Sequence, residues 1–120
     1  MLLTKDQILA AQDRPFEDVE VPEWGGRVRI RGLSGAERDA FEASMIGPDG
    51  KPSPQRFRNF RARLLAQTLV NEQGERLFSD ADIKALGEKS GDVLARLFEI
   101  AQRLSGLTRQ DVETYVKNSE

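Results

Sequence analysis

The chain has 120 residues, of which 38% are hydrophobic and 32% charged, and its formal net charge is −2 at pH 7. This size suits a single domain with its own core, and the near-neutral charge disfavours a dedicated nucleic-acid binder, which carries a basic excess. The sequence has neither cysteine nor histidine, which excludes disulfides, thiolate chemistry and imidazole-based catalysis or metal binding.

The N-terminal segment predicts a short helix rather than a targeting sequence. Thr4 with Gln7 three residues later forms a capping box, so residues 5–12 are expected to be helical, and Pro15 ends that element. The segment lacks the regions of a secretory signal, and no apolar run reaches the roughly 20 residues that span a bilayer. We therefore expect a protein that works in a cytoplasm and does not contact a membrane.

A β-hairpin is predicted by two segments in which apolar and charged residues alternate, 16–22 and 27–31. A turn at Gly25–Gly26 would place Val21 opposite Ile30, whereas a turn one residue earlier would place Val21 opposite Val28. Either register sets aliphatic residues beside each other and acids beside arginines, because only the parity of the pairing matters. We expect the charged face to be solvated and to hold cross-strand ion pairs.

Capping residues and apolar stripes predict further helices after the hairpin. They are expected from Ser34 to about residue 46, over 55–71, from Ser79 to about 87, over about 91–105 and from Thr108 onward. Residues 47–54, rich in proline and glycine, are expected to form an exposed loop. This order predicts an α+β fold, predominantly helical, with one N-terminal β-hairpin packed against a small set of helices in a single domain, 1–120.

Arginines interleaved with Phe57 and Phe60 admit two interpretations: a basic, aromatic surface for nucleic acid, or an amphipathic helix whose arginines flank a buried face. The arginines are Arg56, Arg58, Arg61 and Arg63. At 100° per residue they spread around a helix, whereas Phe57 and Phe60 share a stripe with Leu64, which favours the amphipathic helix. Nucleic-acid binding through residues 56–63 is kept as an alternative.

No catalytic, metal or cofactor site is expected. Asp80, Asp82 and Glu88 do not have the spacing of a calcium-binding loop, and Asp80 and Asp82 suit a helix N-terminus. No serine has a histidine to activate it, so the chain is not expected to be an enzyme. Trp24, beside the hairpin turn, would either fold back onto the core or serve as an exposed anchor for a partner.

Soft motifs spread along the chain carry a resemblance to a known family. They are residues 21–34 (VPEWGGRVRIRGLS), 36–42 (AERDAFE), 61–65 (RARLL), 71–78 (NEQGERLF), 82–90 (DIKALGEKS) and 104–107 (LSGL). In this order and spacing, the chain resembles the small tail assembly chaperones of long-tailed bacteriophages and prophages over about residues 15–118.

The resemblance implies a role in building the phage tail. Such chaperones bind the tape measure protein in the host bacterial cytoplasm, keep it soluble while tail tube subunits polymerise around it, and are absent from the mature virion. They are often made in two forms, the longer by a ribosomal frameshift, and the extension is thought to recruit tail tube protein. This chain would correspond to the short form, and covering a long client would require many copies or a homo-oligomer.

The partner-binding surface is expected on the apolar stripes of the helix at 55–71, or in grooves beside the helices at 92–105 and 109–117. The candidate residues are Trp24, Phe57, Phe60, Arg61, Leu64, Leu107 and Tyr115. The main alternative function is a structural head–tail joining or tail-completion protein, which would remain in the virion.

Overall fold

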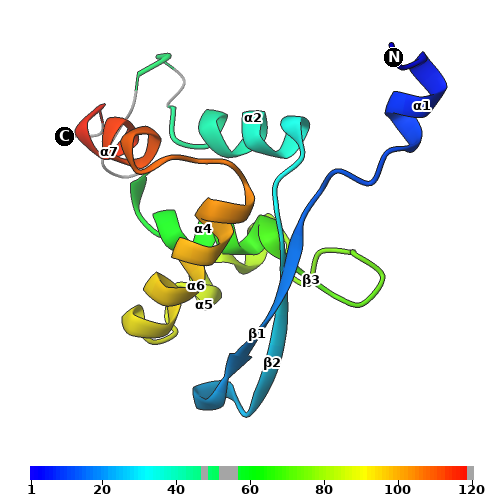
Figure 1. Cartoon of the computed structure of the whole chain (residues 1–120). Coiled ribbons are helices and arrows are strands. Elements are labelled where there is room, and N and C mark those ends of the chain that lie inside the picture. Colours follow the sequence, from blue (N-terminus) through cyan, green and yellow to red (C-terminus); the bar gives the residue numbers. More distant parts are fainter. Residues whose placement is uncertain (47–48, 52–56, 119–120) are drawn as a thin grey trace.

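The computed structural model describes residues 1–46, 49–51 and 57–118 (Figure 1). The first element, α1 (Lys5–Ala10), begins at the expected capping box, in which Gln7 N–H donates to Thr4 Oγ1 at 3.2 Å and Thr4 N–H donates to Gln7 Oε1 at 2.9 Å. The helix ends two residues earlier than predicted. None of its residues is buried, and in Figure 1 it stands apart from the other helices.

The predicted hairpin is present, but both predicted registers are wrong. β1 (Phe16–Val21) pairs antiparallel with β2 (Gly26–Arg31), and Val21 lies opposite Gly26 rather than Ile30 or Val28. The cause is a longer connection: Pro22–Trp24 form a 3₁₀ turn, and Gly25 closes it with a left-handed φ of 79°. The shift is an even number of residues, so the side-chain faces remain as predicted, with Val19 opposite Val28.

The helix predicted over 55–71 is shorter and ends in a strand. Asn59 has a left-handed φ of 61°, and α4 begins after it and covers Phe60–Thr68. The chain then becomes extended, and β3 (Leu69–Val70) pairs antiparallel with Ile30 and Arg29 of β2. This third strand was not predicted, because Leu69 continues the apolar stripe of the helix and only pairing with β2 favours the extended backbone. Residues 55–56 lie outside the described part of the chain.

The remaining helices follow their predicted capping signals. They are α2 (Gly35–Ala43), α5 (Ile83–Leu86, preceded by a 3₁₀ turn at Asp80–Asp82), α6 (Gly91–Leu104) and α7 (Arg109–Asn118). Gly106, with φ of 70°, follows α6 as expected of a helix-ending glycine. Of the loop predicted over 47–54, only 49–51 are described, and these residues are exposed.

The second helix differs from the prediction in its length and its buried face. α2 ends at Ala43 rather than near residue 46. Phe41 and Met45 are buried as expected, whereas Ala36 and Ala40 are exposed. Short alanine side chains add little apolar area, so the one large aromatic residue decides which face of α2 meets the core.

The core lies between the inner face of the sheet and the pair α4 and α6. Leu64 and Leu65 of α4 and Leu97 of α6 are completely buried, as is Ile30 of β2. The buried polar side chain Thr68 donates its hydroxyl to the Leu64 carbonyl oxygen at 3.0 Å, so it keeps a hydrogen bond. The predicted α+β class, mainly helical with an N-terminal hairpin packed against helices, is confirmed, and the sheet has the strand order β1-β2-β3.

At Gly32, directly after β2, the backbone lies close to the end of α6. Its N–H donates to the Pro15 carbonyl oxygen at 2.8 Å. A Cβ atom at this position would lie 2.3 Å from the backbone oxygen of Leu104. A side chain here would therefore push two backbone segments apart.

We expect Gly32→Ala to lower the free energy of unfolding by about 1–3 kcal/mol, because the clash involves backbone that cannot rotate away. Urea denaturation followed by circular dichroism measures the change. Gly35→Ala is the matched control, since a Cβ at the first residue of α2 meets no atom within 4 Å, and its effect should stay within about 1 kcal/mol. Equal stabilities of the two variants would contradict this account of the packing.

Candidate partner-binding surfaces

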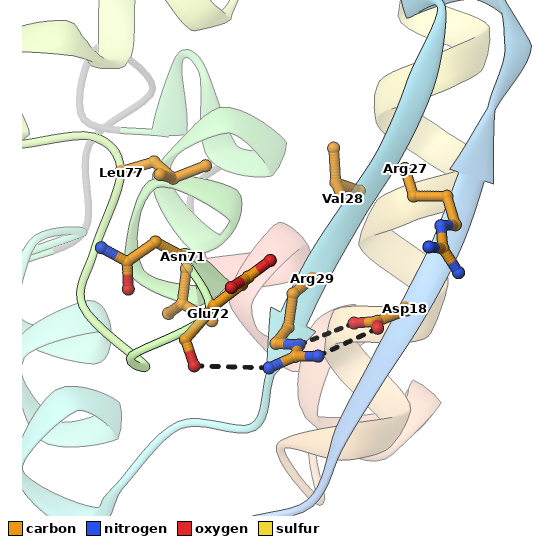
Figure 2. A pocket seen from close by; sticks show the side chains of 8 residues that line it. Asp18, Arg27, Val28, Arg29, Asn71, Glu72 and Leu77 are labelled. Atoms are coloured by element: carbon orange, nitrogen blue, oxygen red, sulfur yellow. Dashed lines mark hydrogen bonds and ion pairs between the residues drawn. The ribbon is translucent and has the colours of Figure 1, made fainter.

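The outer face of the sheet is a polar surface whose charges are paired. In Figure 2, Arg29 lies between Asp18 and Glu72; its guanidinium donates to both carboxylate oxygens of Asp18, at 2.7 and 3.0 Å, and to the backbone oxygen of Glu72 at 3.5 Å. The same guanidinium lies 4.4 Å from the centroid of the Phe16 ring. The hydrogen bond from Arg29 lowers the pKa of Asp18, so this carboxylate stays charged.

This pairing confirms the predicted cross-strand ion pairs, to which Arg27 and Glu20 add a looser one at 3.7 Å. An open hollow of about 460 Å³ lies over this face, between β2 and the segment after β3. Asp18 and Arg29, which line this hollow, are already paired with each other within the fold. Among the described residues, no cluster of three acidic side chains could hold a metal ion.

Trp24 packs against the core from the hairpin tip and remains partly accessible. Its accessible part lines an apolar hollow of about 230 Å³ together with Phe78 and Leu86. The neighbouring Glu23 receives two hydrogen bonds from Arg96 of α6, at 2.9 and 3.0 Å. These bonds lower the pKa of Glu23 to about 2 and hold the hairpin tip on α6. The structure confirms that Trp24 folds back onto the core, and Trp24 also borders a surface hollow; its role as an anchor for a partner stays a prediction.

An aromatic cluster joins α2, α4, α6 and α7, and it contains several of the predicted partner-binding residues. Phe60 is its centre: its ring centroid lies 4.6 Å from that of Phe57, 5.4 Å from Phe41, 5.3 Å from Phe98 and 6.5 Å from Tyr115. Aromatic rings at such separations stabilise one another beyond the apolar area that they bury. The cluster therefore fixes how α7 sits relative to the other three helices.

The other candidates divide between this cluster and the core. The guanidinium of Arg61 lies 5.9 Å from the centroid of the Phe98 ring, so Arg61 borders the cluster. Leu64 is completely buried and Leu107 is 4% exposed, which places both inside the core. The burial of Phe60 and Leu64 confirms the buried face predicted for this helix; Arg61 of α4 and Arg58, which precedes α4, are exposed. Arg56 lies outside the described residues.

Polar contacts fasten α7 to α2 beside the aromatic cluster. The Tyr115 hydroxyl donates to Glu42 Oε1 at 2.9 Å, and Arg38 Nε donates to the same oxygen at 3.1 Å. Arg38 also lies 3.6 Å from Asp111 of α7. Burial and the hydrogen bond to Glu42 raise the pKa of Tyr115 to about 12.

An exposed apolar surface at the N-terminus was not predicted. Of eight large hydrophobic side chains that the structure describes as exposed, five belong to the first nine residues: Met1, Leu2, Leu3, Ile8 and Leu9. The sequence indicates this surface only weakly, because a capped helix with two adjacent apolar residues is as typical of a helix packed on a core as of an exposed one. Only the absence of buried α1 residues separates the two cases.

The sequence profile described as phage tail assembly chaperone matches residues 4–117. The chain belongs to this family. The chain has the same fold as the solved structure of the bacteriophage HK97 tail assembly chaperone, with a TM-score of 0.59. The two sequences are 24% identical, and the match covers 82% of this chain and 94% of that one. No curated protein sequence matches the chain significantly. Across the described ranges of this tail assembly chaperone, no helix combines the length and hydrophobicity of a membrane span.

The raised pKa of Tyr115 provides a test of how α7 is docked. Tyr115 is the only tyrosine of the chain, so the absorbance change of tyrosinate at 295 nm should have its midpoint near pH 12 rather than at the ordinary 10.0. Because folding favours the neutral phenol, the stability from this contact is complete below pH 10.0 and is lost as the pH rises through about 12.

Glu42→Gln should lower the pKa of Tyr115, since it removes a negative charge and the best acceptor, yet leave it above the ordinary value because burial remains. Glu113→Gln, on the exposed side of α7, is the control and should not move the midpoint. Circular dichroism recorded in parallel reports whether the helices persist through the titration. An ordinary midpoint in the folded chain would contradict the docked position of α7.

Proposed function

We propose that this tail assembly chaperone binds the tape measure protein in the host bacterial cytoplasm and keeps it soluble while tail tube subunits polymerise around it. The observation that carries the proposal is the family match over residues 4–117. A protein that shields a long helical client needs accessible apolar surface rather than a catalytic cleft. We take the role to be non-enzymatic.

Three apolar regions of the chain support this role. They are the N-terminal arm with its exposed leucines, the hollow bordered by Trp24 and Phe78, and the surface around Phe57 at the edge of the aromatic cluster. Each is too small to solubilise a long protein by itself. Many copies along one client would combine weak contacts into strong overall binding, because each bound copy raises the local concentration of apolar sites for the next stretch of client.

Two further parts of the proposal concern the assembly process. A longer form of the chain, made by a frameshift, would recruit tail tube protein to the client, and the chaperone would leave before the particle is complete. The paired charges of the sheet are consistent with a protein-binding role, because arginines engaged with carboxylates are poor ligands for phosphates. Nucleic-acid binding through residues 56–63 is not part of the proposal, because the formal net charge of the chain is −2.

Co-expression with the cognate tape measure protein tests the central claim. We expect the soluble fraction of the tape measure protein to rise several-fold when the chain is present. Leu97→Asp, which places a charge at a completely buried site of α6, should abolish the effect by unfolding the chain. Glu99→Ser, on the exposed side of the same helix, should retain it. If the tape measure protein is equally soluble with and without the chain, the proposal fails.

Mass spectrometry of purified virions tests whether the chain acts only during assembly. We expect no peptides of the chain in mature particles, while an extract of infected cells contains them in abundance. Detection at a fixed stoichiometry per particle would instead indicate a head–tail joining or tail-completion protein.

A further inference from the structure

The described side chains of the C-terminal helix are less buried than those of the helices beneath it. α4 contributes six buried residues and α6 contributes five. Of the α7 side chains that the structure describes, none is buried: Val112 and Tyr115 are half-buried, and Glu113, Thr114 and Lys117 are exposed. The described side chains of α7 therefore cover a surface that the other helices form, and Val112 and Tyr115 pack against the core without being completely buried.

The surface under α7 combines aromatic rings with two polar anchors, and we call it the α7 seat (Arg38, Phe41, Glu42 and Phe60). The Tyr115 ring meets Phe41 edge to face, with centroids 6.3 Å apart and an interplanar angle of 81°, and its hydroxyl donates to Glu42. Arg38 faces Asp111 in the first turn of α7. The seat thus suits a helix with three features: an acidic side chain, an apolar side chain and an aromatic ring that carries a hydrogen-bond donor.

The α7 seat shares Phe60 with a hollow whose lining, among the described residues, includes none from α7. Phe60 borders both, and the hollow, of about 270 Å³, is lined further by Phe57, Leu94 and the small residues Gly87 and Gly91. A helix that extended past Phe60 into this hollow would contact Phe57 and Leu94 beside the polar side chains of Asn59 and Arg61. Such contacts would compensate for the high effective concentration of α7, which is tethered to the same chain.

We propose that the α7 seat and its adjoining hollow form the docking site for an amphipathic helix of the client, and that α7 is an intramolecular occupant which the client displaces. The inference rests on the proposed function, since it takes the client to be the helical tape measure protein. The sequence of α7 indicates which residues the client helix should carry. They are a carboxylate that pairs with Arg38, an aliphatic residue directly after it, and an aromatic residue three positions after the aliphatic one. In the absence of client, α7 keeps the rings of Phe41 and Phe60 out of water.

The first experiment uses α7 itself as the probe. A synthetic peptide of residues 108–118 is added to an ¹⁵N-labelled chain that ends at Leu107, which retains this buried side chain. We expect amide shifts at Arg38, Phe41 and Glu42 in the shortened chain and none in the full chain, whose seat is occupied. A peptide carrying Tyr115→Ala should bind at least several-fold more weakly.

A folded shortened chain that does not respond to millimolar peptide, the effective concentration expected of a short tether, would overturn the proposal. If the shortened chain does not fold, the full-length variant Tyr115→Ala decides, because it loosens α7 and retains the rest of the molecule. Its affinity for a soluble, tagged fragment of the cognate tape measure protein is compared with that of the unaltered chain on a sensor surface.

Tyr115→Ala should bind the client more tightly, by about tenfold if α7 occupies the seat nine-tenths of the time. Phe57→Ala, which removes part of the hollow, should bind more weakly, and Glu113→Ala should bind like the unaltered chain. Weaker or unchanged binding by Tyr115→Ala would overturn the inference, because it would make Tyr115 a direct contact or a bystander. Failure of the unaltered chain and of all variants to bind would instead count against the proposed function and the client assignment together.

Discussion

The packing of α4 against α6 under the inner face of the sheet is the constraint on which the rest of the structure depends. Leu64 and Leu65 on one helix and Leu97 on the other are completely buried, and Ile30 closes the layer from the sheet. The hairpin could not be stable by itself, because two strands bury too little apolar surface. Once α4 is in place, its last residues are carried to the edge of β2, where Leu69 and Val70 become a third strand.

Ion pairs then align the hairpin with the helices. Arg96 and Arg103 of α6 reach Glu23 and Glu17, both at 2.9 Å, so β1 and its turn are attached to the helix that lies beneath them. Exposed pairs of this kind add little to overall stability, but they fix one orientation among several that the apolar contacts would permit.

The structure separates the parts of the chain that maintain the fold from those available to a partner. The core helices contribute most of the buried residues, whereas α1 stands apart from the other helices (Figure 1) and the described side chains of α7 are half-buried or exposed. For a member of the phage tail assembly chaperone family, this is a reasonable division of roles. The core helices keep the protein folded, and the less buried ends of the chain can exchange their contacts for contacts with another protein.

Local chemistry in the sequence determined the starts of α1, α2 and α7 and the parity of the hairpin. Thr4, Ser34 and Thr108 cap helices because their side chains reach nearby backbone amides, an interaction that needs no tertiary partner. Parity follows in the same way from the alternation of valines and charges along the strands.

Only the tertiary structure decided the hairpin register, the third strand and the grouping of the candidate site. The register depends on the conformation of Pro22–Gly25, and β3 depends on where α4 delivers Leu69. Phe41 and Phe98 join Phe57, Phe60 and Tyr115 in one cluster, although the sequence showed each of them only as part of its own helix. A stripe of apolar residues states that a helix has a buried face, but what covers that face is set by contacts between residues distant in the chain. For the same reason, the exposed Ile8 and Leu9 of α1 could not be distinguished from core residues until their surroundings were known.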